Sequence, residues 1–120
     1  MNQIEPIYHL TLNSDWQTAL GVGIYRGNTL ETEHFIHCST RAQVLEVANR
    51  IFAARTDLLL LELNPACVVP EIRWELAENG ETYPHIYGPL NIDAVTRVWT
   101  LTLSPAGYFT WSDQIGGTKP

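Results

Sequence analysis

The chain has 120 residues, of which 45% are hydrophobic and 17% charged, enough apolar material for one domain with a single packed core. Seven basic residues against thirteen acidic ones give a formal net charge of −6, and Lys119 is the only lysine. Proteins that bind nucleic acids neutralise phosphates with many basic side chains, so this composition excludes a long polyanion as partner. No apolar stretch reaches membrane-spanning length, and no signal-peptide pattern is present. We therefore expect a cytoplasmic protein without a membrane partner.

The two cysteines, Cys38 and Cys67, are far apart in sequence and have apolar or β-branched neighbours. This usage is typical of reduced thiols and not of a disulfide framework. No cysteine pair or helical pair of histidines has the spacing of a metal-binding motif. We expect no metal.

The first half of the chain predicts two strands and a helix. Residues 7–12 alternate apolar and polar side chains, which indicates a strand. A helix is expected from Asp15 to about Leu20, ending at the glycines that follow. After a turn-rich link at residues 25–28, a short strand is predicted over residues 34–38.

The clearest helix signal begins at Thr40. Thr40 with Gln43 three residues later forms a capping-box pattern. The apolar positions that follow have helical spacing: Val44, Val47, Ala48, Ile51 and Phe52. A helix is therefore expected to start at this point and to bury one face.

The second half of the chain predicts strands. The apolar run within residues 57–63 is typical of a strand buried on both faces, which places it at the centre of the sheet. Further strands are predicted over residues 66–74, 83–90, 95–103 and 107–109. Pro70 indicates an edge position or a bulge. We expect one domain over residues 1–120, with a core at about 7–109 and a flexible tail at 112–120.

His37 is the strongest candidate for chemistry, because it is followed by Ser39 and Thr40 at the predicted start of the helix. An imidazole, hydroxyls and free backbone N–H groups would then converge, and a helix N-terminus favours an anion. The alternative is purely structural. In that interpretation Ser39 or Thr40 is only an N-cap, and His37 is a hydrogen-bonded, half-buried side chain.

The segment from Pro84 to Pro89 places prolines and a glycine around His85 and Tyr87. Such a rigid segment suits the wall of a pocket, although a structural turn is the competing interpretation. Two short His-x-hydroxyl units, His9 with Thr11 and His37 with Ser39, match the arrangement that a two-histidine phosphodiesterase uses.

Several of these segments together resemble a known family, catalogued as domain of unknown function 952. The segments are Tyr8-His9, Trp16, Tyr25, residues 35–40, Gln43, residues 47–50 and residues 84–89. The resemblance covers about Ile7 to Phe109. It implies an α+β, ADP-ribosyltransferase-like fold: a split, strongly bent, mostly antiparallel β-sheet with about two helices. It also implies a cleft that holds NAD or an ADP-ribose-type group.

From the positions of these residues in the shared motifs, the resemblance implies that His9 contacts a ribose of the ligand. It also implies that Ser39, on a following strand, supplies the hydroxyl group of the site. Glu75 is the candidate for the late-strand glutamate, with Glu62 as the alternative, and His37 and His85 are the candidate acid–base residues. The further candidate ligand-binding residues are Tyr25, Thr40 and Tyr87.

Three functions follow from these residues. The leading hypothesis is a transferase or hydrolase that acts on NAD or an ADP-ribose-type ligand, with no metal. The second is a non-catalytic small-molecule binding or regulatory module, and the third is a metal-independent two-histidine phosphodiesterase. The sequence leaves open whether the domain is an enzyme; in each case the expected partner is a small molecule.

Overall fold

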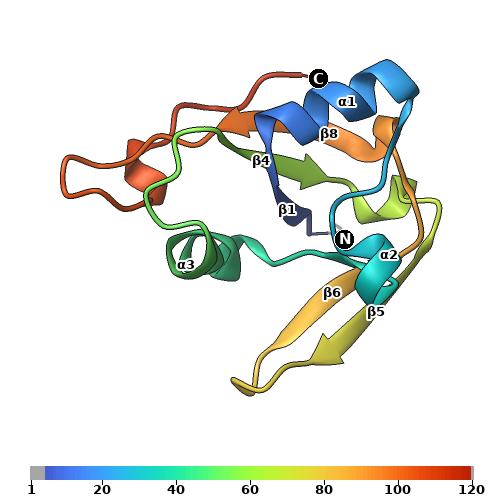
Figure 1. Ribbon diagram of the computed structural model, residues 1–120. Helices are drawn as coiled ribbons and strands as arrows, with labels where there is room; N and C mark the ends of the chain where they lie inside the picture. The colour runs from blue at the N-terminus through green and yellow to red at the C-terminus, as the bar shows by residue number, and fades with distance from the viewer. Residues whose placement is uncertain (1–4, 120) are drawn as a thin grey trace.

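The computed structural model describes residues 5–119, which form three α-helices and eight strands (Figure 1). The α-helices are α1 (Asn13–Val22), α2 (Leu30–Glu33) and α3 (Arg41–Ile51). The strands are β1 (Ile7–Leu12), β2 (Ile24–Tyr25), β3 (Ile36–His37), β4 (Leu58–Leu63), β5 (Glu71–Leu76), β6 (Thr82–Tyr87), β7 (Leu90–Asn91) and β8 (Val95–Thr100). Short 3-10 helices span Pro65–Cys67, Ile92–Ala94 and Trp111–Asp113.

All strand pairs are antiparallel, and they form sheets in the orders β1-β4-β8, β2-β7 and β3-β6-β5. The two three-stranded sheets meet at one isolated bridge, in which Tyr8 and Ser39 exchange backbone hydrogen bonds of 2.8 Å. Strands β5 and β6 form a hairpin that projects from the rest of the molecule (Figure 1). The result is an α+β fold with a sheet that is split between β1 and β3.

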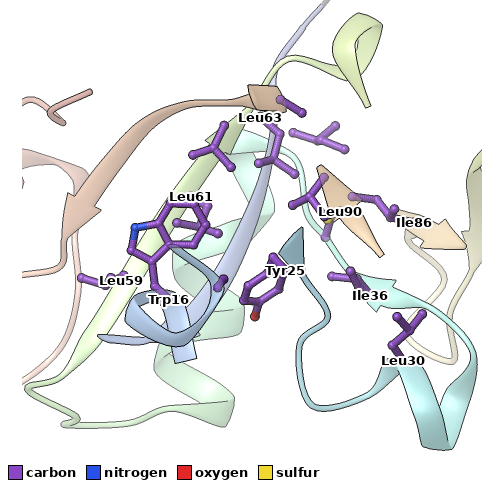
Figure 2. Close-up of a cluster of buried hydrophobic side chains, with 14 residues drawn as sticks. Trp16, Tyr25, Leu30, Ile36, Leu59, Leu61, Leu63, Ile86 and Leu90 are labelled. Atoms are coloured by element: carbon purple, nitrogen blue, oxygen red, sulfur yellow. The ribbon is translucent and has the colours of Figure 1, made fainter. Parts of the chain in front are cut away.

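The two faces of the β1-β4-β8 sheet bury separate apolar clusters. Because side chains alternate along a strand, β4 sends Leu59 and Leu61 to one cluster and Leu58 and Leu60 to the other. The first cluster also holds Trp16 of α1 and joins the two sheets (Figure 2). The second cluster is covered by α3. The prediction of a central strand buried on both faces is therefore confirmed for β4.

The helix predicted from Thr40 is confirmed. Thr40 is the N-cap of α3, and its backbone N–H donates to Oε1 of Gln43 at 2.9 Å within a capping box. The buried helix residues are Val44, Leu45 and Ala48. The predicted buried face of this helix included Ile51, at the end of α3, but Ile51 is 58% exposed.

The N-terminal elements differ from prediction in their bounds. Helix α1 is longer than residues 15–20, because Gly21 is accommodated within it and the helix ends only where Gly23 adopts φ 94°. The predicted turn-rich link is followed by α2, whose cap His34 has φ 72°. This left-handed conformation cannot belong to a strand, so the strand predicted at 34–38 is reduced to Ile36–His37.

The strand predicted over residues 66–74 is also shifted. Pro65 starts a 3-10 turn capped by Asn64, and the strand begins only at Glu71, after Pro70. The edge position that Pro70 indicated is confirmed, since β5 is the last strand of its sheet. Gly88, with φ 153°, allows a close approach, because a Cβ atom there would lie 3.0 Å from Cβ of Pro70.

One expectation for the C-terminal segment was wrong. Residues 107–109 form no strand, because the side chain of Asn49 binds the backbone N–H and C=O of Phe109 at 2.7 and 2.9 Å. The flexible tail expected at 112–120 stays a prediction, and one backbone pairing lies within its described part. Thr118 exchanges backbone hydrogen bonds of 2.7 and 3.0 Å with Val98, and these satisfy part of the edge of β8. Pro120 lies outside the described residues.

The helices within residues 5–119 are all too short or too polar to cross a bilayer.

Candidate functional site

A groove with a volume of about 830 Å³ lies where α3, the β5-β6 hairpin and the split between β1 and β3 meet. Its lining includes His9 of β1, His37 of β3 and His85 of β6. Helix α3 contributes Val47 and Arg50 to the opposite side. This volume is in the range of small-molecule binding sites. The split in the sheet therefore opens a site that contains three of the four histidines.

His85 lines this groove and forms a hydrogen-bonded group with Glu75 and Tyr87, which do not themselves line it. Nδ1 of His85 lies 2.8 Å from Oε1 of Glu75, and the Tyr87 hydroxyl donates to the same oxygen. The β5-β6 register causes this contact, because Arg73 faces His85 and Glu71 faces Tyr87, which places Glu75 on the same face of the hairpin as both rings. A carboxylate that holds Nδ1–H leaves Nε2 of His85 to accept a proton.

His37 lies beside His85, because the two are partners in the β3-β6 ladder and their ring centroids are 5.2 Å apart. Nε2 of His37 donates to Oε2 of Glu33 at 3.1 Å. The Phe35 ring stacks on His85 with a centroid distance of 4.1 Å and an interplanar angle of 16°. Two histidines, each held by its own carboxylate, are thus fixed side by side at the groove.

The charge on this group is set by its hydrogen bonds. The bond from Tyr87, followed by the bond from His85, holds the pKa of Glu75 below its ordinary value. The same carboxylate raises the pKa of Tyr87, which keeps the phenol protonated as a donor. The guanidinium of Arg73 lies 4.2 Å from the centroid of the Tyr87 ring. Glu75 is therefore an anion at neutral pH and can stabilise a protonated His85.

His9 belongs to a different, closed network. Its side chain is buried, with Nδ1 at 2.5 Å from the His37 carbonyl oxygen and Nε2 at 2.7 Å from the Tyr25 hydroxyl, which also lies 2.9 Å from Oγ1 of Thr11. Burial lowers the pKa of His9 to about 4, so the ring is neutral at pH 7. A carbonyl only accepts, so Nδ1 carries the proton and Nε2 accepts from Tyr25.

The other predicted ligand-binding residues are placed as follows. Tyr25 is buried in the first apolar cluster, and burial raises the pKa of its hydroxyl. Ser39 is 5% exposed and lines the groove beside the backbone bridge to Tyr8. Thr40 has the N-cap position, as in the structural interpretation of that residue. The cysteine next to His37, Cys38, is buried, and burial raises its thiol pKa, which disfavours a nucleophilic thiolate.

The glutamate alternatives separate clearly. Glu75 contacts His85 and Tyr87, whereas Glu62 lies across the sheet, where it accepts from the Tyr8 hydroxyl at 3.3 Å and pairs with Arg97 at 4.0 Å. Glu62 is therefore not brought into the histidine group.

Sequence reasoning missed Glu33 as a partner of His37 and Arg50 as a groove residue. A usable signal for Glu33 was its position four residues before His37, although the two lie in different elements. For Arg50 the signal was its place on the helix predicted from Thr40. Within residues 5–119 no three His, Cys, Asp or Glu side chains are arranged to hold a metal ion.

Comparison with known proteins places the chain in a family. The family described as "Protein of unknown function (DUF952)" matches residues 10–98. The chain belongs to the DUF952 family. The crystal structure of protein CC0527 from Caulobacter crescentus is similar, with 28% identity and a TM-score of 0.81, over 90% of this chain and 96% of that one. Its solution NMR structure gives 29% identity and a TM-score of 0.79, over 90% and 94% of the two chains.

No curated protein matches this chain. The family resemblance seen in the sequence is thus confirmed, and the α+β fold with antiparallel sheets is one that a solved bacterial protein shares. The DUF952 description carries no activity, so the function has to be argued from the groove itself.

Proposed function

We propose that this DUF952 domain is an acid–base enzyme that cleaves the bond between nicotinamide and ribose in NAD, or a related bond of an ADP-ribose-type ligand. One observation carries the proposal: His37 and His85 lie side by side at the groove, each held by a carboxylate. A histidine held in this way accepts a proton from an attacking hydroxyl, and its carboxylate stabilises the imidazolium that forms.

The charge of the groove supports cleavage of a glycosidic bond over chemistry at a phosphate. Its lining contains the acids Glu33, Glu46 and Glu78 and one arginine, Arg50. Bond breaking at an anomeric carbon passes through a cationic, oxocarbenium-like transition state, which carboxylates stabilise. Nicotinamide leaves with the bonding electron pair, and water or an acceptor hydroxyl adds to the anomeric carbon after giving its proton to His85.

Arg50, which pairs with Glu46 at 3.0 Å, is the partner that we propose for a phosphate of the ligand, because it is the one arginine or lysine among the residues that line the groove. His9 and Ser39 line the groove as well, and we propose that they limit its depth at the ribose. The ADP-ribosyltransferase-like character of the fold belongs to this proposal and is supported by the split between β1 and β3.

The phosphodiesterase alternative needs His9 as an acid or base. Both ring nitrogens of His9 have hydrogen-bond partners, and its pKa of about 4 keeps it neutral. This geometry favours the pair His37 and His85 over the pair His9 and His37.

Release of nicotinamide from NAD tests the proposal. We expect His85→Gln to lower the rate by about 10²–10⁴-fold, the usual contribution of a general acid–base group. His34→Asn is the matched control, since His34 is exposed and has φ 72°, which asparagine also tolerates. Binding of NAD without any release would instead identify a non-catalytic binding module, and absence of binding would refute the ligand class.

A further inference from the structure

The outer edge of β5 is a second feature of the hairpin, separate from the groove. Strand β5 is the last strand of the sheet β3-β6-β5, and its six residues pair with β6 along one side only. An edge strand of this kind presents unpaired backbone groups that form a template for another strand.

Pro84 determines which residues of β5 present these groups. Pro84 faces Trp74, has no N–H, and its carbonyl accepts from Cys38 on the β3 side at 3.0 Å. Trp74 therefore has no backbone bond to β6, so its N–H and C=O point to the open edge. The alternation of an antiparallel ladder gives Ile72 and Leu76 the same orientation. Within residues 5–119 none of these three has a backbone partner across that edge.

Two of these residues, Trp74 and Leu76, also carry apolar side chains that the fold leaves in solvent, whereas Ile72 packs partly against the first cluster. Trp74 is 54% exposed, and Leu76, the last residue of β5, is 75% exposed. Proteins usually protect an open edge with charges, prolines or a bulge. We call Ile72, Trp74 and Leu76 the outward-bonding residues, because their backbone groups point to the open edge of β5. They are a tryptophan and two aliphatic residues, which is the composition of a surface that is covered.

We propose that two copies of this chain pair antiparallel through β5, with Trp74 opposite Trp74 of the second copy. This two-fold register sets Ile72 opposite Leu76 of the second copy, so all three outward-bonding residues form hydrogen-bonded pairs. On the other face of the strand it sets Arg73 opposite Glu75 of the second copy. Apolar residues thus face apolar residues, and opposite charges face each other on both sides of the axis.

Charge complementarity selects this register over its neighbours. A shift of the axis by one residue toward the start of β5 sets Arg73 opposite Arg73 and Glu71 opposite Glu75. A shift in the other direction sets Glu75 opposite Glu75. Like charges directly opposite each other destabilise a strand pair, so the register centred on Trp74 is the favourable one.

The pairing brings a residue of the second copy to Glu75, the partner of the groove residue His85. Oε1 of Glu75 accepts from both His85 and Tyr87, and the side chain retains 38% exposure. Arg73 of the second copy then lies against this carboxylate. The dimer thereby adds a cation beside the Glu75–His85 pair, independently of what the groove binds.

Sedimentation of the full chain from micromolar to millimolar concentration tests the proposal. We expect a monomer–dimer equilibrium. Trp74→Pro deletes the outward N–H and places an imino ring at the edge without removing a bond to β6, so it should abolish the dimer while the circular dichroism spectrum is retained. Trp74→Phe keeps the N–H and an aromatic ring and should still dimerise.

A charge exchange provides the second arm, which does not depend on how proline is tolerated. Arg73→Glu alone sets the introduced carboxylate of each copy opposite Glu75 of the other and should weaken the dimer about tenfold. The double variant Arg73→Glu, Glu75→Arg restores opposite charges and should recover dimerisation. A chain that stays monomeric at millimolar concentration, or a dimer that neither Trp74→Pro nor Arg73→Glu weakens, would overturn the proposal.

Discussion

The molecule contains two groups in which a histidine and a tyrosine are joined by hydrogen bonds, and they differ in their access to solvent. In the closed group, His9 and Tyr25 are buried and satisfy each other with Thr11 and a backbone carbonyl. In the open group, His85 and Tyr87 share the Glu75 carboxylate beside the groove. The closed group has no charge and stabilises the fold, whereas the open group has an ionised acid and spare proton-accepting capacity. The same residue types thus serve structure in one place and chemistry in the other.

The largest expected effect on stability is at His9. His9→Ala leaves a cavity and removes the partner of Tyr25, so we expect the free energy of unfolding to fall by about 3 kcal/mol. Urea denaturation measures this. His85→Ala is the corresponding variant in the open group, and we expect it to lower the free energy of unfolding less. An equally large loss in both variants would contradict the division between the two groups.

The second effect is a pH dependence that comes from His9. Its pKa is about 4 in the folded chain against 6.5 ordinarily, so the unfolded chain binds a proton first as the pH falls. The stability that this pKa difference contributes is fully present above pH 6.5 and is lost as the pH falls from 6.5 to 4. The total loss of unfolding free energy is roughly 3 kcal/mol. Unfolding free energies measured across this range should show a slope that is smaller in His9→Gln. An unchanged slope would show that His9 is not the group responsible.

The third prediction compares matched removals of one hydroxyl. Tyr25→Phe leaves Nε2 of buried His9 without a donor and should cost about 1–3 kcal/mol. Tyr87→Phe removes a bond to a carboxylate that water can reach, so we expect a clearly smaller loss of unfolding free energy than for Tyr25→Phe. Equal losses in denaturation experiments would mean that the open group is as sequestered as the closed one.

The smallest effect concerns the acidity of Glu75. The Tyr87 hydroxyl is the main cause of its lowered pKa, so Tyr87→Phe should raise that pKa toward the ordinary value of 4.5. NMR titration of the Glu75 side-chain carboxyl measures the change. If the Glu75 carboxyl titrates identically in the wild type and in Tyr87→Phe, a group other than Tyr87 lowers its pKa.

The sequence predicts well what depends on near neighbours. The capping box of Thr40 and Gln43 and the apolar run of β4 both follow from local patterns, and both are present in the structure. The extent of short elements is not predictable in this way, because the left-handed His34 and the Asn49 contact to Phe109 depend on the tertiary arrangement.

The candidate site was predictable in its residues but not in its contacts. His37, His85 and Tyr87 are candidates from their segments, and Glu75 is a candidate from the family resemblance, with Glu62 as its alternative. Their grouping depends on the register of β5 on β6 and of β6 on β3, which residue types do not specify. For the same reason the sequence could suggest His9 as a ligand-binding residue, although the fold buries it.

The experiment that decides whether the open group is the functional site is thermal unfolding with ADP-ribose and with NAD. A ligand at about 100 times its dissociation constant stabilises the folded state by roughly 2.7 kcal/mol, which raises the midpoint of unfolding by several degrees. We predict such a shift for the wild type and for His34→Asn, and a reduced shift for a variant that removes both His37 and His85. A shift of equal size in the double variant, or no shift with either ligand in the wild type, would contradict this assignment.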